Sequence, residues 1–228
     1  MTRRFLVLSI CFLLLGLTQT AGAYSFSVDR GTTWTDVDAI TGDKSAAEYY
    51  SYSSPNASSS NLPFAADGKG YFFLYKESNT GILSIGVTMS AKGGSSPGNA
   101  AFTISGNPGW TWLVSDDTYE VQGNDNTPSW QWSANYGDGG MLGGSEPSEW
   151  ETTWTFDSYS GIDDWYFIDS NGSSYVLDFP SIVVAAVNDT LIIKSGSTSS
   201  VPEPGTMILL GTGLAGLAGF RKRQQKRK

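Results

Sequence analysis

Between Tyr24 and Lys194 the chain alternates short runs of aromatic and β-branched residues with clusters of Gly, Asn, Asp, Ser and Pro. Within several runs, including residues 152–156, polar and apolar residues alternate as they do in half-buried strands. We expect strands at residues 24–28, 70–75, 82–90, 101–105, 110–115, 130–134, 152–156, 165–168, 175–179, 182–187 and 190–194, with a short helical turn at 46–50. Turn-forming residues such as Asn171-Gly172 separate the runs. The pattern predicts one all-β domain over residues 24–194, an antiparallel β-sandwich or jelly roll.

The N-terminus has the composition of a processing segment. It carries a basic pair, an apolar run over residues 5–17, and the small-residue site Ala21-Gly22-Ala23. These are the three parts of a secretory signal peptide. We predict a signal peptide at residues 1–23 that directs export through the Sec translocon and is cleaved after Ala23. The alternative is an uncleaved anchor, but the apolar run is shorter than the roughly 20 residues that a membrane span needs.

Charge and residue usage exclude several kinds of chemistry. Cys11, the only cysteine, lies in the predicted signal peptide, so the mature domain would have no disulfide and would depend on its hydrophobic core. Histidine is absent, which excludes Ser-His-Asp and Cys-His catalysis and any His-ligated metal site. Residues 24–200 hold 21 of the 22 acidic residues but only six Lys and Arg. A domain this acidic would repel nucleic acid, so no nucleic-acid partner is expected.

The C-terminal residues form an ordered series of segments. Residues 195–200 are a small, polar linker of the flexible kind. The peptide Val201-Pro202-Glu203-Pro204 follows, and its two prolines oppose helix formation. Residues 205–220 are apolar or small and would form a single transmembrane helix of about 24 Å. The basic tail at 221–228 would stay cytoplasmic by the positive-inside rule, which leaves the β-domain outside the inner membrane.

This order of segments closely resembles the PEP-CTERM sorting signal of Gram-negative bacteria. The matching features are Val201, Pro202, Glu203 and Pro204, the glycine-rich span, and the terminal Arg/Lys run, all within residues 201–228. The resemblance implies a transient hold in the inner membrane. An exosortase, a membrane-embedded cysteine transpeptidase, would then cut near the motif and release the protein to the surface. The motif residues would be recognised in a substrate and would not be catalytic. The alternative is an ordinary C-terminal anchor behind a proline-rich stalk.

Two tryptophan pairs are the first candidates for a binding site. Trp110 and Trp112 are two residues apart, as are Trp130 and Trp132, so each pair faces one side of its strand. We expect these rings in the core, because a buried Trp adds a large apolar area to a domain without disulfides. The alternative is an exposed platform that stacks on sugar rings, as in carbohydrate-binding modules.

Acidic loops are the second group of candidates. The clusters are Asp116-Asp117, Asn124-Asp125-Asn126, Asp163-Asp164 and Asp169-Ser170-Asn171-Gly172. Hard oxygen ligands in loops could hold Ca²⁺, but none of the clusters fits the twelve-residue EF-hand pattern. Asp and Asn are also common turn formers, and turn formation is the simpler interpretation. No specific metal site is predicted.

Four carboxylates near a glycine-rich stretch are the third group. Asp138, Glu146, Glu149 and Glu151 flank residues 137–144. Glycoside hydrolysis requires only two carboxyl groups at the correct separation and no histidine. An acidic chain contains such pairs by chance, so no catalytic residue is predicted.

The sequence therefore favours a non-enzymatic exported protein of the cell surface, envelope or extracellular matrix. The PEP-CTERM resemblance implies an organism that makes exopolysaccharide, and with it a role in biofilm and exopolysaccharide as a partner. A carbohydrate-binding module is the main alternative, and a glycoside hydrolase is the second.

Overall fold

The computed structural model describes residues 24–28, 33–51, 62–90, 93–115, 119–121, 123–177, 179 and 189–196. All of these residues belong to one compact unit, Gly22–Gly196. The predicted signal peptide, the expected strand at 182–187 and the C-terminal residues 197–228 lie outside the described residues. Within the described ranges, no helix has the length and apolar character that a membrane crossing requires.

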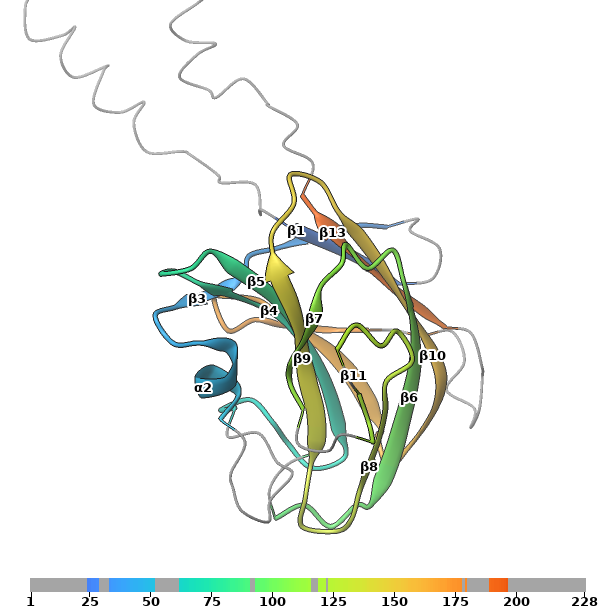
Figure 1. Cartoon of the computed structure of the whole chain (residues 1–228). Helices are drawn as coiled ribbons and strands as arrows, with labels where there is room; N and C mark the ends of the chain where they lie inside the picture. Colours follow the sequence, from blue (N-terminus) through green and yellow to red (C-terminus); the bar gives the residue numbers. More distant parts are fainter. Residues whose placement is uncertain are drawn as a thin grey trace, which may run out of the picture. The chain divides into compact units, whose positions relative to one another are not determined.

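The all-β prediction is confirmed, because the described residues form two sheets with one short helix (Figure 1). The first sheet has the order β2 (Thr35–Val37), β1 (Tyr24–Val28), β13 (Thr190–Ser195), β10 (Glu151–Ser160), β6 (Gly98–Ser105) and β8 (Ser129–Trp132). The second sheet has the order β12 (Ser174–Val176), β11 (Asp164–Ile168), β4 (Lys69–Glu77), β5 (Ile82–Met89), β9 (Asp138–Ser145) and β7 (Thr111–Val114), and β3 (Ile40–Gly42) also pairs with β4.

Two strand pairs depart from the antiparallel arrangement that we expected. Both β11 and β3 run parallel to β4, with β11 opposite Lys69–Phe73 and β3 opposite Tyr75–Glu77. Because β5 occupies the other edge of β4, the two strands follow each other along the same edge. Parallel partners need a long crossover connection. The chain between β3 and β4 supplies one, and it contains the helix α2 (Ala46–Tyr50).

The core between the two sheets consists largely of aromatic rings. Phe102 and Trp154 come from the first sheet and Phe72 from the second, and each is at most 1 % exposed. The centroids of Phe72 and Trp154 lie 5.2 Å apart with their planes at 81°, so the rings meet edge to face. This arrangement is favourable for aromatic pairs because a positive ring edge meets a negative ring face.

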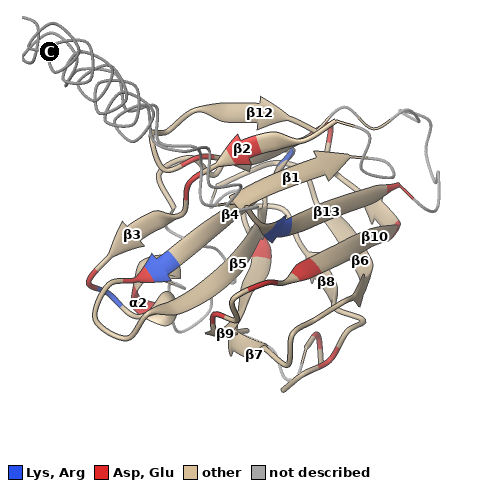
Figure 2. Ribbon diagram, turned by 90° about the horizontal axis from the view of Figure 1, so that it is seen from above, with Lys and Arg blue, Asp and Glu red and all other residues tan. Residues whose placement is uncertain are grey.

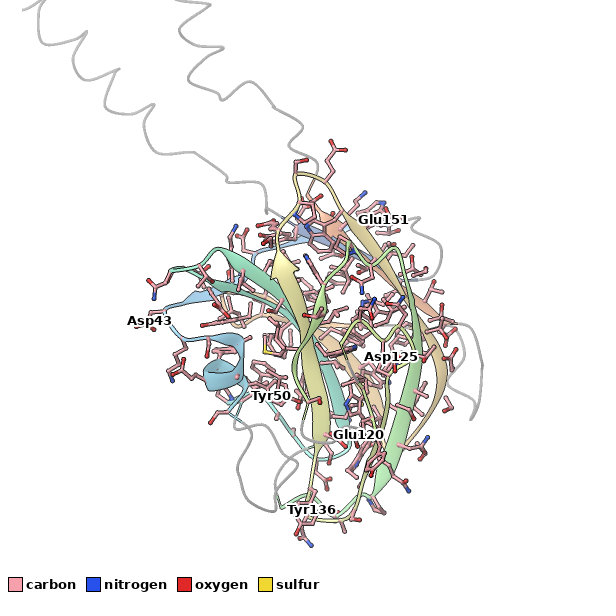
Figure 3. All side chains as sticks on the ribbon, viewed as in Figure 1. Asp43, Tyr50, Glu120, Asp125, Tyr136 and Glu151 are labelled. Carbon is pink, nitrogen blue, oxygen red and sulfur yellow. The ribbon has the colours of Figure 1, made fainter. Side chains whose placement is uncertain are left out.

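A second apolar cluster covers the outer face of β4. Phe72 faces the core between the sheets, whereas its neighbours Tyr71 and Phe73 face α2 and the segment that follows it. Tyr50 points from α2 toward the second sheet, and its hydroxyl donates to the Val87 carbonyl at 3.1 Å (Figure 3). Burial on both faces explains why β4 is an almost continuous apolar run.

The predicted helical turn at residues 46–50 is confirmed as α2, and its N-terminus is held in two ways. Ser45 and Glu48 form a reciprocal capping box. The carboxylate of Glu77, at the end of β4, accepts from the Ala46 N–H at 2.8 Å. The helix is therefore fixed to the strand that it covers.

The glycine-rich stretch that we did not assign to a strand is β9, an interior strand of the second sheet between β5 and the edge strand β7 (Figure 1). Glycine weakens a strand unless another group must approach the backbone closely. A Cβ at Gly143 would lie 2.6 Å from the Leu83 carbonyl oxygen, and one at Gly140 would lie 2.6 Å from the Val114 carbonyl oxygen. The glycines are therefore needed for close approach of the neighbouring strands.

We expect Trp154→Ala to lower the free energy of unfolding by about 3–5 kcal/mol, because it removes a fully buried ring and leaves a cavity. The control is Tyr119→Ala, at a ring that is 94 % exposed, which should change stability by less than about 0.5 kcal/mol. Urea unfolding followed by circular dichroism measures both. Equal midpoints for the two variants would contradict the assigned core.

Candidate functional site

The two ends of the described domain lie next to each other. Tyr24, the first residue of β1, is directly opposite Ser195, the last residue of β13. The two strands run side by side in both views (Figures 1 and 2). On its other side, Tyr24 is opposite Val37 of β2. The predicted signal peptide ends immediately before Tyr24, and the predicted linker begins at Ser195, so both processing segments join the domain at neighbouring residues.

The connection between β9 and β10 holds both ends in place. The Ser195 N–H donates to the Trp150 carbonyl at 3.0 Å, and the Trp150 N–H donates to the Ser195 Oγ at 3.0 Å. The Trp150 ring lies 6.0 Å from the Tyr24 ring. The Tyr24 hydroxyl is hydrogen-bonded to the Glu146 carboxylate. We call Tyr24, Glu146, Trp150 and Ser195 the terminal clasp. These contacts extend β13 one residue beyond the predicted domain end at residue 194.

A buried tyrosine and an ion pair set the electrostatics of the terminal clasp. Burial raises the pKa of Tyr24, and the hydrogen bond to Glu146 and the negative charges of Glu146 and Asp38 raise this pKa further. The Lys76 Nζ donates to the Glu146 carboxylate at 2.7 Å. At neutral pH, Tyr24 therefore stays a protonated donor, and the Glu146 carboxylate lies between two partners, Tyr24 and Lys76.

A cavity of about 410 Å³ lies beside the terminal clasp. Its lining residues are Tyr24, Asp38, Ala39, Thr41, Lys76 and Ser170. The carboxylate of Asp169 supports this wall by accepting from the N–H groups of Asp38 at 2.9 Å and Ser170 at 2.7 Å. Lys76, the one cation of the lining, is already bound to Glu146. The lining combines polar and apolar groups, and its lysine already stabilises the fold.

The tryptophan pairs are core residues, as we expected. Trp110, Trp130 and Trp132 are at most 3 % exposed, and Trp112 packs against the same core. The indole N–H groups of Trp110 and Trp132 donate to the carbonyls of Ser145 and Ser96. The alternative sugar-stacking platform is therefore wrong for Trp110, Trp130 and Trp132, because buried rings present no face to a ligand. Trp112 is half-buried against the same core.

Three of the four acidic clusters are engaged in local contacts. Asp163 and Asp164 both form ion pairs with Lys69 at the start of β4. Asp125 accepts from the N–H and the hydroxyl of Thr127 at 2.9 and 2.8 Å, which is the geometry of an Asx turn. Figure 2 shows such acidic residues mostly in the connections between strands.

The cluster at residues 169–172 forms the turn between β11 and β12. The Gly172 N–H donates to the Asp169 carbonyl at 2.9 Å, and the Ser173 N–H donates to the Asn171 side chain at 2.7 Å. Asp116 and Asp117 lie outside the described residues. In the described part of the chain, no three His, Cys, Asp or Glu side chains converge as metal ligands would. The calcium hypothesis stays a prediction.

The four candidate carboxylates do not all lie together in one site. Asp138 begins β9 and Glu146 follows its last residue, so the eight-residue strand places them about 26 Å apart. Figure 3 shows both ends of β9. The labelled Tyr136 lies near the end with Asp138, and the labelled Glu151 lies near the end with Glu146. A glycosidase needs its carboxyl groups within about 5–10 Å. Asp138 is therefore too far from Glu146 to act with it as a catalytic pair.

Sequence reasoning did not identify the terminal clasp. Trp150 and Ser195 are 45 residues apart, and Lys76 and Glu146 are 70 apart. No local pattern signals contacts at such separations. The only pointer was the position of Tyr24 directly after the predicted cleavage site.

We expect Tyr24→Phe to reduce the loss of stability at alkaline pH. Above about pH 10 an unfolded tyrosine loses its proton, whereas folded Tyr24, whose pKa is raised, keeps it. The free energy of unfolding therefore falls by about 1.4 kcal/mol per pH unit for each such group. Burial raises the pKa of Tyr49 to about 12, so Tyr49 should maintain part of the slope in the variant.

Urea unfolding at pH 8 and pH 11 measures this difference. Tyr119→Phe, at a 94 % exposed ring, is the control and should keep the wild-type difference. A Tyr24→Phe protein with an unchanged difference would contradict the buried hydrogen bond to Glu146.

The comparisons with known proteins concern the C-terminal segment. Residues 200–224 match the family model of the PEP-CTERM protein-sorting motif. No curated protein matches the chain, and no solved structure matches it. The match confirms the resemblance at Val201-Pro202-Glu203-Pro204 and assigns no family to the β-domain. The chain therefore carries a PEP-CTERM sorting motif at its C-terminus, which marks it as an exported surface protein that an exosortase processes.

Proposed function

We propose that this chain is a non-enzymatic component of the cell envelope or extracellular matrix, built as a single β-sandwich domain. The domain is exported through the Sec translocon, held transiently in the inner membrane by residues 205–220, and released after exosortase processing. The observation that carries the proposal is the sorting motif at 200–224, which begins five residues after the last strand. A chain with this order of segments is cargo for a sorting enzyme.

The candidate residues support a structural role for the domain. The tryptophan pairs fill the core, and Asp138 lies far from Glu146 along β9. Glu146 is bound by Lys76 and by Tyr24. The full sequence contains no histidine, so the common His-dependent hydrolases are excluded. These observations favour a domain whose polar groups maintain a fold.

The role in biofilm follows from the PEP-CTERM resemblance, which implies an exopolysaccharide-producing organism. The composition of the domain is compatible with a place in an exopolysaccharide matrix. Residues 24–200 combine 21 acidic residues with six basic ones, and such a charge keeps a domain soluble and separated from its copies. With no cysteine after Cys11, the exported domain does not depend on oxidation for its stability.

Replacement of Glu203 and both flanking prolines by alanine should abolish processing in the native host. The variant should remain in the membrane fraction with residues 201–228 attached, whereas the wild-type protein should reach the surface without its basic tail. Cell fractionation and intact-mass spectrometry measure location and cleavage. Ser197→Ala in the linker is the control and should be processed normally. The same cleavage and the same location for all three proteins would contradict the proposed route.

The matrix role predicts that the wild-type protein co-purifies with exopolysaccharide from the native host. Enzymatic digestion of the polysaccharide should release the protein into the soluble fraction. The purified protein should produce no new reducing ends from the same polysaccharide, because no catalytic carboxylate pair is proposed. Recovery of the protein apart from the polysaccharide would contradict the matrix role, and new reducing ends would contradict the non-enzymatic one.

A further inference from the structure

Trp34 differs from the other seven tryptophans of the chain, because it lies outside both apolar clusters. It directly precedes β2, and its side chain is half-buried. Phe26 of β1 faces the core and is opposite Thr35, so the alternation of strand side chains places Trp34 on the outer face of the first sheet. The packing of the two sheets against each other therefore does not account for this indole.

Lys194 holds the Trp34 ring against the sheet. The Lys194 Nζ lies 3.4 Å from the centroid of the ring, which is close enough for a cation–π interaction. Lys194 belongs to β13 and Trp34 precedes β2, whereas β1 lies between these two strands. The two side chains therefore meet across β1, where Ser25, opposite Lys194, is small enough to let them pass. An aromatic ring and an ammonium group thus lie together on the outer face.

Short hydroxyl side chains cover the outer face from β13 to β6. Thr190 is opposite Thr155, and Thr155 is opposite Thr103, so three threonines form one row across neighbouring strands. Neighbouring strands are about 4.8 Å apart, so this row is about 10 Å long. Two residues from Thr155, Thr153 is opposite Ser105. We call these five half-buried or exposed residues the hydroxyl face. The strands that carry them lie side by side in Figure 2.

The hydroxyl face and Trp34 belong to one continuous surface. Thr153 is opposite Ile192 of β13, and Ile192 is opposite Ser27 of β1. The register of β1 with β2 places Trp34 next in this row, beside Ser27. Three strand spacings therefore separate Trp34 from Thr153, a span of about 14 Å. No long side chain stands in this row, so an extended polymer can lie along it.

Charge indicates the kind of polymer that fits. The hydroxyl face has no ionisable side chain, and Asp157 at its border accepts from the Thr103 hydroxyl at 2.8 Å. Residues 24–200 contain 21 acidic and six basic residues, so the domain repels both an anionic polymer and a second copy of itself. An uncharged polysaccharide meets no such repulsion. Its hydroxyls match side chains that both donate and accept, and its C–H groups can pack on the face of an indole ring.

We propose that Trp34, Lys194 and the hydroxyl face form a binding surface for an uncharged polysaccharide. Sugar C–H groups pack on Trp34, and the Lys194 ammonium group donates to sugar hydroxyls beside the ring. The hydroxyls of Thr153 and Thr155 bind the sugar rings that follow. The inference rests on the proposed matrix role and assigns that role to one face of the domain.

Affinity electrophoresis of the full-length protein in nonionic detergent tests this surface. The neutral probes in the gels are hydroxyethylcellulose, xyloglucan and galactomannan, and alginate is the anionic probe. At least one neutral probe should retard the wild-type protein more strongly than alginate does. Trp34→Ala should raise the Kd for that probe about tenfold, because the stacked ring is lost. Tyr119→Ala, at a ring that is 94 % exposed, is the control and should bind as the wild type does.

A second variant obstructs the surface and leaves the aromatic ring in place. Thr155→Lys puts a long side chain in the middle of the hydroxyl face and should also raise the Kd about tenfold. Ser174→Lys makes the same change of charge at an exposed position of β12, in the other sheet, and should leave the Kd unchanged. Circular dichroism shows whether each variant keeps the wild-type fold.

Wild-type affinity in both Trp34→Ala and Thr155→Lys would overturn this inference alone, because the protein would still bind polysaccharide through another surface. Stronger retardation by alginate than by every neutral probe would overturn it as well. If no probe retards the wild-type protein, the inference fails. In that case the matrix role stands when the protein still co-purifies with exopolysaccharide from the native host, and it fails when the protein does not.

Discussion

The burial of aromatic rings between two sheets is the interaction on which the rest of the domain depends. With its one cysteine in the predicted signal peptide, the domain has no covalent cross-link, and rings such as Phe72, Phe102 and Trp154 hold the sheets together. The arrangement has a cost. The indole N–H groups of Trp130, Trp154 and Trp165 have no oxygen acceptor in the described structure. Each of these rings meets a neighbouring ring near 80°, an orientation in which an aromatic face can replace part of the lost hydrogen bond.

The acidic composition is accommodated mainly by backbone donors, because the domain has few cations. Asp67 shows the pattern: its carboxylate accepts from the N–H groups of Ser95 and Ser96 and from the hydroxyls of Ser90 and Ser95. The Ser95 N–H is the main cause of the lowered pKa of Asp67. Asp67 thereby ties two loops together as a charged group, and this contribution to stability disappears as the pH falls through its folded pKa. Asp125 and Asp169 use the same kind of contact. Carboxylates that resemble metal ligands in the sequence thus act as acceptors that shape loops.

The sequence predicted the features that depend on local pattern. Alternating runs located most strands, and the spacing of Trp130 and Trp132 indicated one buried face. β9 was missed because glycine, which lowers strand propensity, is required there for close approach of neighbouring backbones. The parallel partners of β4 were missed because pairing direction depends on which distant segments meet, and strand composition does not record it. The terminal clasp was missed for the same reason, since Trp150 and Ser195 meet only after β9, β10 and β13 have assembled.

The sorting signal and the fold of this protein differ in the same way, because the first depends on local sequence and the second on distant contacts. The sorting motif is contiguous at residues 200–224, so an enzyme can read it in an extended chain and the sequence alone reveals it. The fold of the domain depends instead on segments that are distant in sequence, because its first and last strands must come together before the first sheet is complete. The two kinds of information meet at Tyr24 and Ser195, where linear processing segments join a cooperative structure.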